Sequence, residues 1–357
     1  MELCSEEATK YVWEGSIPLQ IHLHESEVTT LPAPPPAMIL GPRVGYLPLL
    51  THLIKPHFGS TLPPGEDTVW FEYKGLPLKW YIPTGVLFDL LCAEPERPWN
   101  LTVHFRGHPG EILTPCEGED SVKWSYINSL KEAAYIINGN CKNVMNMSQA
   151  DQFELWQSLV KGNMDGYIRI SSRLKLGPVG EDCIVRKGSS VGQPQPSAEE
   201  NEISGSNRPC RIPVRLYVRS FDGDIDELED AATVDNWDVI SYINRPVEIQ
   251  REDSMCSYIT LKTAMKSLLP DIFGNDQEHD YVSEANSETT AENDQLEETT
   301  SKCRPEVPTS KKVKLIQVRI QGIEPDLSIP FFWVVNNLKN PESFLHICVF
   351  VSKTESS

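Results

Sequence analysis

Apolar and polar residues alternate along a stretch near the start of the chain. Ile17, Leu19, Ile21 and Leu23 recur at every second position, and a period of two predicts a strand with one buried face. Strands and helices then follow in the order strand, strand, helix, strand, strand, short helix, strand, which is the order of a ubiquitin-like β-grasp. The expected elements are 17–23, 37–40 after a proline-rich turn, 46–54 with Pro48 in its first turn, 69–73, 78–82, 86–92 and 101–105.

The same pattern returns in the second half of the chain. IPVRLYV at 212–218 matches IPLQIHL at 17–23 in its alternation and in the position of its proline. Later, Pro330 in SIPFFWVVNNL corresponds to Pro83 in YIPTGVLFDLL. We interpret the chain as an internal duplication. In the second copy we expect a helix at 261–269 ended by Pro270, strands at 313–321 and 344–351, and polar insertions too poor in apolar residues to stay ordered at 222–238 and 271–311.

Between the two copies, the stretch 121–138 has the pattern of an amphipathic helix. Ser121, beside Asp120, is the expected N-cap, and Gly139 is the expected stop. Ile127, Leu130, Ala134 and Ile137 recur at helical spacing, and Lys131 stands at the edge of this apolar stripe. A second helix is expected at 148–161, with Ser148 and Asp151 as a capping box and Leu155, Trp156, Leu159 and Val160 on one face. A third is expected around 167–174.

These patterns predict an α+β protein in which two ubiquitin-like β-grasp domains flank a helix-rich domain. The expected divisions are an N-terminal helix at 1–14, the first ubiquitin-like domain at 15–106, a linker at 107–120, the helix-rich domain at 121–177, a flexible linker at 178–209, the second ubiquitin-like domain at 210–352 and a tail at 353–357.

Charge is concentrated in two segments. Of the net charge of −19, the stretches 222–238 and 271–301 supply eight and ten acidic residues without any Lys or Arg. The remainder is nearly neutral and has no basic face of useful size, so we expect no nucleic-acid partner. Two small basic clusters are either solvated strand faces, which we favour, or weak contacts with an anionic membrane. They are Lys311, Lys312 and Lys314, and Arg211, Arg215 and Arg219.

Other features indicate a soluble, unexported protein of the cytoplasm. The apolar runs are too short to span a bilayer and no leader sequence is present. The nine cysteines are irregularly spaced without a CxxC pair, which indicates reduced thiols and not a disulfide frame or a zinc site.

The sequence offers no clear catalytic chemistry. It contains no glycine-rich phosphate loop, no HExxH and no GxSxG motif. His22 and His24 share one face and could form half of a metal site, but without a third ligand nearby we interpret them as polar surface. A Cys–His nucleophile is also conceivable, although no local signature supports it and a buried thiol is the simpler interpretation. We therefore expect a scaffold without cofactor, metal or catalytic residue.

Several long stretches carry a family resemblance. They are VWEGSIPLQIHL, PPGEDTVWFEYKGLPLKWYIPTGVLFDLL, PERPWNLTVHFRG, NSLKEAAYIINGNCKNVMNMSQ, RIPVRLYVR and PFFWVVNNLKNPESFLHICVFV. Together they resemble the autophagy protein 5 family, and its plant-type members in particular. The resemblance covers most of 11–178 and 208–351, and it lapses at 178–207 and 271–309.

The resemblance implies a covalently modified scaffold. Family members are joined by an isopeptide bond to the ubiquitin-like autophagy protein 12, through a lysine in the motif that reads SLKEAA here, which is Lys131. This implies work by E1-like and E2-like enzymes. A lysine ε-amine suits the role because it can attack a thioester carbonyl once deprotonated, and the small Ala133 and Ala134 would leave room for that approach. Lys123, Lys142 and Lys161 are the competing lysines of the same region.

The resemblance also implies further partners. Family members bind the amino-terminal helix of autophagy protein 16 in a groove, and the complex acts like an E3 factor that promotes attachment of autophagy protein 8 to phosphatidylethanolamine. The chain would then be cytoplasmic and recruited to the forming autophagosomal membrane. From the residues alone, a helix lysine is more simply a solvated side chain, so a non-covalent β-grasp adaptor that gathers partners remains the alternative.

Overall fold

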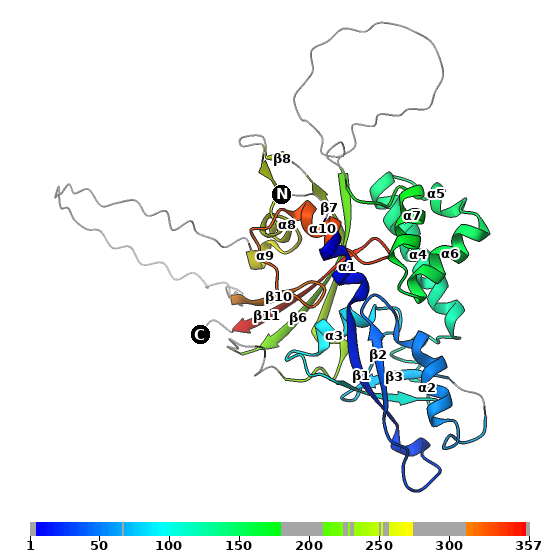
Figure 1. Ribbon diagram of the computed structural model, residues 1–357. Coiled ribbons are helices and arrows are strands. Elements are labelled where there is room, and N and C mark those ends of the chain that lie inside the picture. Colours follow the sequence, from blue (N-terminus) through cyan, green and yellow to red (C-terminus); the bar gives the residue numbers. More distant parts are fainter. Residues whose placement is uncertain are drawn as a thin grey trace, which may run out of the picture.

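The structure is a computed structural model that describes residues 5–65, 68–179, 210–223, 228, 232–249, 251–252, 257–273 and 312–354. Two sheets with their helices lie side by side, and a group of helices packs against one side of both (Figure 1). Short helix α1 (Glu6–Glu14), capped by Ser5, precedes the first sheet. The α+β architecture expected from the sequence is confirmed.

The first sheet contains five strands in the order β2-β1-β5-β3-β4. Its central pair, β1 and β5, is parallel and its outer pairs are antiparallel. The strands are β1 (Ser16–Leu23), β2 (Ala37–Pro42), β3 (Trp70–Tyr73), β4 (Leu76–Pro77) and β5 (Trp99–His104). The helices are the 3-10 turns η1 (Glu25–Glu27) and η2 (Leu47–Leu50) and the α-helices α2 (Thr51–Phe58) and α3 (Thr84–Leu91).

Two details of the first module differ from the predicted pattern. The returning strand is β4, not 78–82, because Ile82 N–H donates to Lys79 O (3.1 Å) and closes a turn where a strand was expected. The predicted helix 46–54 is a 3-10 turn followed by α2, which continues to Phe58 with Pro56 inside it.

The second sheet repeats the first in strand order. Its order β10-β11-β6-β7 again places a parallel pair, β6 and β11, at the centre. The strands are β6 (Cys210–Asp222), β7 (Ile240–Ile249), β10 (Lys312–Arg319) and β11 (Leu345–Thr354), with a small ribbon of β8 (Arg251–Glu252) and β9 (Ser257–Tyr258) beside them. The helices are η5 (Trp237–Val239), α8 (Leu261–Leu268), α9 (Pro270–Phe273) and α10 (Phe331–Leu338).

The prolines used to align the two halves occupy equivalent places. Pro83 is the N-cap of α3 and Pro330 is the N-cap of α10, with similar backbone angles. Pro18 and Pro213 both lie on the first strand of their module. The predicted duplication is therefore confirmed.

Four helices form the group between the modules: α4 (Glu119–Asn138), α5 (Lys142–Met145), α6 (Gln149–Val160) and α7 (Met164–Arg173). The prediction of Ser121 as the cap of α4 is wrong, because Gly118 is the N-cap and the helix starts at Glu119. Ser121 lies within the first turn, where its hydroxyl accepts from the N–H of Glu117. Ser148 does cap α6, as predicted. Val160 is exposed and does not belong to the buried face of that helix.

Two hydrophobic cores cross the module boundaries. One joins the helices of the middle region to the inner face of the second sheet and its helices. The other joins the interior of the first module to the outer face of the second sheet, through Tyr217, Phe221, Cys348 and Phe350. Helix α3 of the first module and helix α4 therefore cover the outer face of the second sheet. The equivalent face of the first sheet is largely exposed, at His22, Met38 and Leu40. The three parts are packed as one body.

The predicted disordered insertion at 222–238 is wrong for the residues that the structure describes, 222–223, 228 and 232–238, while 224–227 and 229–231 lie outside them. Leu228, Val234 and Trp237 are buried in the core of the first module, and Trp237 Nε1 donates to Pro77 O (2.8 Å). These apolar side chains are few among many acidic residues, so the average composition of the stretch gave no sign that they pack inward. Of the other expected insertion and linker, 274–311 and 180–209 lie outside the described residues, and 271–273 belongs to α9.

Buried arginines hold the two modules together. From the second sheet, Arg219 donates to the carbonyls of Leu90 and Leu91, at the end of α3. Arg319 donates to the carbonyls of Cys92 and Ala93 just beyond it. Because the last carbonyls of a helix have no partner within it, these guanidinium groups satisfy them across the domain boundary.

The predicted solvated face along Arg211, Arg215 and Arg219 is wrong for two of its members. Arg219 is fully buried and Arg215 is largely so, while Arg211 forms an exposed pair with Glu248. In the other cluster, Lys314 is exposed and Lys311 lies outside the described residues.

Candidate functional site

Helix α4 presents an exposed stripe in which Lys131 stands between two aromatic residues. Trp124, Asn128, Lys131 and Tyr135 are separated by four, three and four positions, so they lie on one face of the helix. Trp124 is 62% exposed and Tyr135 is 64% exposed. Exposed aromatic side chains of this kind offer a large apolar contact area with a polar tip. Lys131 itself is half-exposed, and its Nζ donates to Asn128 Oδ1 (3.4 Å).

The adjacent face of α4 is fixed to the second module. Glu132 accepts from Arg215 Nη2 (3.0 Å) and from Asn244 Nδ2 (2.6 Å), and Arg215 also donates to Ser129 Oγ (3.2 Å). Arg215 further lies over the ring of Phe344, 3.8 Å from its centroid. These contacts begin at the residue next to Lys131, so they fix the rotation of the helix at that position.

A buried polar cluster of Glu342 and His346 interacts electrostatically with Arg215. Glu342 Oε1 lies 2.7 Å from His346 Nε2, and both side chains are buried. Burial alone would raise the pKa of Glu342, but His346 and then Arg215 hold that pKa below its usual range. Burial lowers the pKa of His346, against the opposing effect of Glu342. Charge complementarity between Glu342 and Arg215 thus favours one position of the guanidinium.

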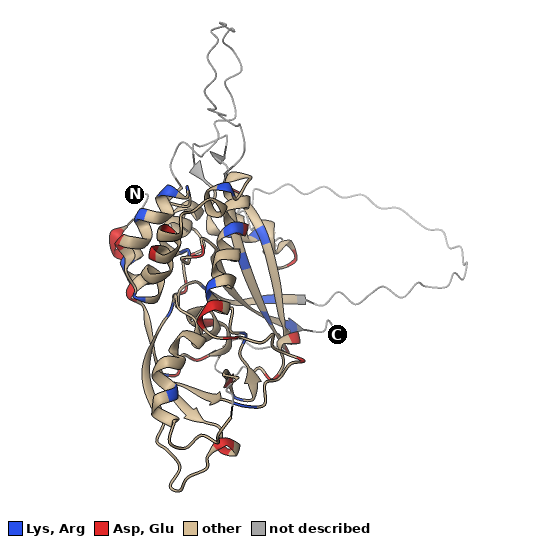
Figure 2. Ribbon diagram, turned by 90° about the vertical axis from the view of Figure 1, so that its right-hand side faces the viewer, with Lys and Arg blue, Asp and Glu red and all other residues tan. Residues whose placement is uncertain are grey.

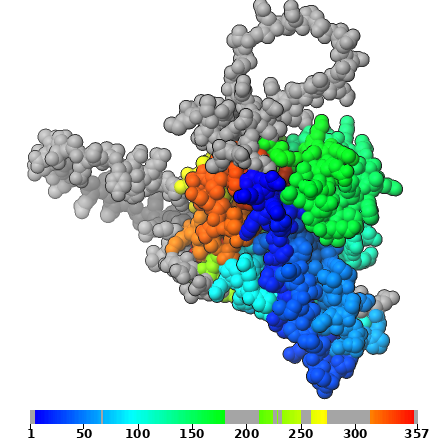
Figure 3. Space-filling view, in the orientation of Figure 1, coloured from blue at the N-terminus to red at the C-terminus, as the bar shows by residue number. Residues whose placement is uncertain are grey.

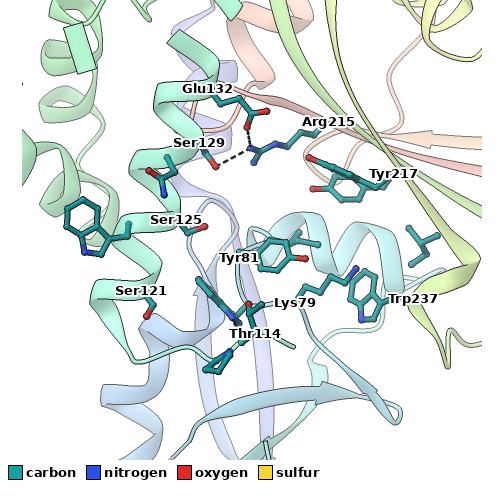
Figure 4. Close-up of a pocket in the computed structure, with 17 residues that line it drawn as sticks. Lys79, Tyr81, Thr114, Ser121, Ser125, Ser129, Glu132, Arg215, Tyr217 and Trp237 are labelled. Atoms are coloured by element: carbon teal, nitrogen blue, oxygen red, sulfur yellow. Dashed lines mark hydrogen bonds and ion pairs between the residues drawn. The ribbon is translucent and has the colours of Figure 1, made fainter. Parts of the chain in front are cut away.

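A cavity of about 760 Å³ opens beside α4, where the three parts of the protein meet (Figure 4). One wall is the face of α4 from Ser121 to Glu132, a second is the segment 79–82 of the first module, and the third comes from β6, η5 and β7. Asn128, which accepts from Lys131, is among the lining residues, while Lys131 is not. Lys131 therefore stands at the rim, between the lining residues Asn128 and Glu132.

Lys79 lies inside this cavity and was not singled out by the sequence. Its Nζ lies 4.5 Å from the ring centroid of Trp237, a cation–π contact. Burial lowers the pKa of Lys79, with Asp238 acting in the opposite direction. The sequence KWYIP, predicted as part of a strand, gave no signal of this environment, because the environment depends on Trp237 from the other module.

The three competing lysines lie at different positions from Lys131 in the structure. Lys142 and Lys161 are exposed beyond α4, and Lys123 lies on α4 next to Trp124. The expectation that Ala133 and Ala134 leave room for an approach to Lys131 is wrong, since both alanines are buried in the core. The space around Lys131 comes instead from its position on the open stripe.

A second, more enclosed hollow of about 270 Å³ lies between α1, α7 and the segment that follows α10. Its walls include Trp13 and Tyr167, whose rings are 4.8 Å apart, and the exposed Ile168. Asn337 on its other side accepts from Ser5 N–H (2.7 Å) and so ties α1 to α10. This hollow is mainly apolar and all three parts of the protein contribute to it.

The histidines considered as a metal pair have other contacts. His22 Nε2 lies 3.0 Å from Gln20 Nε2, and His24 hydrogen bonds with Ser26 and stacks on His104. Among the residues that the structure places, no three His, Cys, Asp or Glu side chains form a group suited to a metal ion. Within the same residues no helix has the length and apolar character needed to cross a bilayer.

Charges of both signs are interspersed on the helices of the middle region (Figure 2). Arg173 pairs with Asp151 (2.8 Å) and Arg169 pairs with Glu154. These pairs leave the face of α6 and α7 electrically mixed.

Three family models together match most of the chain. They are "Autophagy protein ATG5, UblA domain" over residues 12–105, "Autophagy protein ATG5, alpha-helical bundle region" over 119–177 and "Autophagy protein ATG5, UblB domain" over 211–349. Each range coincides with one of the three packed parts described above.

Curated relatives agree with these models. The chain is 61% identical to autophagy protein 5 of Oryza sativa subsp. indica, over 97% of this chain and 94% of the relative. It is 59% identical to autophagy protein 5 of Arabidopsis thaliana, over 97% and 98%. The crystal structure of Kluyveromyces marxianus Atg5 covers 97% of this chain and 100% of its own, with a TM-score of 0.61 at 19% identity, which shows a common fold.

Proposed function

The chain belongs to the autophagy protein 5 family as a plant-type member, and on that premise we propose that it is a scaffold that becomes covalently attached, through Lys131, to the ubiquitin-like autophagy protein 12. The observation that carries the proposal is the open stripe of α4. It presents Lys131 between two exposed aromatic side chains, on a helix whose adjacent face is fixed by Arg215 and Asn244.

The proposed reaction is an acyl transfer to the lysine amine. Lys131 loses a proton, and its nitrogen attacks the carbonyl of a thioester that joins the carboxyl terminus of protein 12 to a cysteine of an E2-like enzyme. The new C–N bond forms as the C–S bond breaks, and the thiolate leaves and is protonated. This chain supplies only the nucleophile and its position, so its contribution to the rate is orientation.

The half-exposed position of Lys131 suits this role. Its stem can extend from the rim without opening the core, because the next residue, Glu132, holds the helix in place. Trp124 and Tyr135 would supply apolar contact area on either side of the reacting amine.

The test is conjugation in a mixture of purified E1-like enzyme, E2-like enzyme and protein 12. Lys131→Arg keeps the charge and the helix but removes the acceptor, so we expect no conjugate that survives boiling and reductant. Lys123→Arg, on the same helix, is the matched control and is expected to conjugate normally. A conjugate of undiminished yield from Lys131→Arg, mapped by mass spectrometry to Lys79 or Lys123, would overturn the assignment.

We further propose that the hollow between α1, α7 and the segment after α10 receives the amino-terminal helix of autophagy protein 16. Apolar anchors on one side of a helix require an apolar groove, and Trp13, Tyr167 and Ile168 provide such a lining. Because all three parts of the protein form its walls, binding there would also stabilise their packing.

Replacement of Ile168 by Asp tests this groove. The change places a charge against the apolar surface of the partner helix, and we expect at least tenfold weaker binding by calorimetry. Ile112→Asp is the matched control, since Ile112 is similarly exposed but outside the hollow. Equal affinities of the two variants would contradict the placement.

Together these roles describe an E3-like factor without an active site of its own. We propose that the conjugate, with protein 16, brings the E2-like enzyme carrying autophagy protein 8 to phosphatidylethanolamine, and that the chain is cytoplasmic and recruited to the forming autophagosomal membrane. In a liposome assay, the conjugate should raise the rate of lipid attachment, and the Lys131→Arg chain should not.

A non-covalent adaptor is the alternative function, favoured by the exposed outer face of the first sheet. A single gel of cell extract separates the two. The covalent proposal requires a species larger by one ubiquitin-like protein under denaturing, reducing conditions, and the adaptor requires only the unmodified chain.

A further inference from the structure

The loop between β1 and β2 carries a proline-rich segment that neither the fold nor the proposed function requires. Residues 32–36 read Pro-Ala-Pro-Pro-Pro and have no helix or strand structure. Each proline fixes its own φ near the polyproline II value, and a residue that precedes proline is driven toward the same extended region. The Leu31–Pro32 peptide is cis, and from Pro32 onward nearly every residue is restricted in one of these ways, which favours a polyproline II conformation over 32–36.

The orientation of the segment leaves one edge of this helix open. A polyproline II helix has three residues per turn, so Pro32 and Pro35 lie on the same edge. Both are exposed, whereas Pro34 and Pro36 are half-buried. The carbonyl of Pro35 accepts from His57 Nε2 (2.9 Å) of α2, which anchors the segment to the domain. The two prolines at PxxP spacing are thus presented to solvent on a fixed support.

The sequence on either side of the segment is mostly apolar and carries no charged side chain. No Asp, Glu, Lys or Arg occurs from Val28 to Pro42. Leu31 is 96% exposed, and Met38 and Leu40 on the edge strand β2 are 63% and 68% exposed. Prolines on an edge strand can serve only to block pairing with another strand. Here they are accompanied by exposed apolar side chains, which is the composition of a contact surface.

The location keeps this surface free. The loop is at the end of the first module that points away from the helices α4–α7 and from the second module (Figure 1), and the space-filling view shows that end projecting from the body (Figure 3). Neither the Lys131 stripe nor the hollow beside α1 includes residues of this loop.

We propose that segment 31–40 is a docking site for a protein module with an aromatic-lined, uncharged groove of the kind that binds polyproline II helices. Trp and Tyr rings of such a groove would pack on Pro32 and Pro35. The module would gain affinity from a ligand that is already ordered. Grooves that pair their own acidic residues with a basic flank of the ligand are a poor fit, because the nearest cation along the chain, Arg43, is buried in an ion pair with Asp89.

The proposal is tested with the full-length chain and three purified probes: a WW domain and an EVH1 domain, whose grooves are aromatic, and an SH3 domain, whose groove adds acidic residues. We expect saturable binding of a WW or EVH1 domain in calorimetry. The Pro32→Ala/Pro35→Ala variant should bind at least tenfold more weakly. Pro63→Ala/Pro64→Ala, at another surface proline pair of the same module, is the matched control and should change the affinity less than twofold.

A second variant protects the test against a folding defect. Ala33→Asp retains every proline and introduces a charge between Pro32 and Pro35, so it should also weaken binding at least tenfold while its melting temperature stays that of the parent chain. The proposal is overturned if neither aromatic-groove domain binds the parent chain at 0.5 mM, if only the SH3 domain binds, or if the double variant and Ala33→Asp bind as the parent does.

Discussion

Arg319 offers the sharpest test of how the two ubiquitin-like modules are joined. It extends from β10 of the second module to the end of α3 in the first, where its Nη1 donates to Cys92 O (2.8 Å) and more weakly to Asp89 O (3.3 Å), and its Nη2 donates to Ala93 O. Its guanidinium also lies 5.1 Å from the ring centroid of Phe350. Burial lowers the pKa of Arg319, and Asp89 acts in the opposite direction.

Truncation to alanine would leave these carbonyls buried without a donor. A buried polar group that loses its partner costs roughly 1–3 kcal/mol. Two well-formed bonds are lost, with a third weaker one and the packing on Phe350. We therefore expect Arg319→Ala to reduce the free energy that holds α3 against the second sheet by about 3–5 kcal/mol.

Native-state hydrogen exchange measures this directly. A loss of about 3 kcal/mol corresponds to roughly a hundredfold faster exchange of the α3 amides that open with the interface. Arg319→Lys keeps the charge but not the planar fork, so exchange should be intermediate. Arg211→Ala, at an exposed pair with Glu248, is the control and should change stability by less than about 1 kcal/mol. Exchange in Arg319→Ala within threefold of the parent chain would refute the reasoning.

Three further outcomes are expected. Trp237→Ala removes a buried indole from the boundary between the modules, so thermal and chemical unfolding should show a loss of roughly 3–5 kcal/mol, whereas the exposed Trp124→Ala should leave stability nearly unchanged. Burial lowers the pKa of His104 to about 4. Between pH 6.5, near the pKa of an unfolded histidine, and pH 4, the unfolded chain binds a proton that the folded chain does not, so the free energy of unfolding should fall by roughly 2–3 kcal/mol from pH 7 to pH 4.5. His104→Gln should make this pH dependence weaker in urea titrations. Gly85→Ala would place a Cβ 2.9 Å from the Arg43 backbone carbonyl at the start of α3, so it should destabilise the first module by about 1–3 kcal/mol, and an unchanged melting temperature would contradict that contact.

Much of the fold could be predicted because its signals are local. Alternating residues identified β1, and helical spacing with Ser148 as a cap identified α6. The equivalence of Pro83 and Pro330 identified the duplication, since both prolines start the same helix in their module.

The rest depends on contacts between parts that are distant in sequence. From the sequence alone, Arg219 resembles a solvated strand residue. In the structure it donates to two carbonyls of α3 in the other module. Trp237 lies in an acidic stretch whose average composition indicates disorder, yet it fills a site beneath Pro77. The sequence pattern predicts the wrong start for α4 because Ser121 resembles an N-cap. In the structure its hydroxyl accepts from the N–H of Glu117 instead.

The candidate site was predicted only in part. The family motif pointed to Lys131, and periodicity put it at the edge of an apolar stripe. Neither indicated that Trp124 and Tyr135 flank it, because single aromatic residues on the polar side of a helix carry no periodic signal. Lys79 was missed for a related reason, since its surroundings are assembled from three separate segments.

The unequal burial of the two sheets has a consequence for how this duplicated protein can change over evolutionary time. Tyr217 and Phe350 on the outer face of the second sheet are packed against the first module, so a substitution at either position also requires the packing of the first module to change. The matching face of the first sheet meets water at His22 and Leu40 and can vary one residue at a time. Of two copies that began alike, the second is constrained as architecture, while the first keeps a face on which new partners can be acquired.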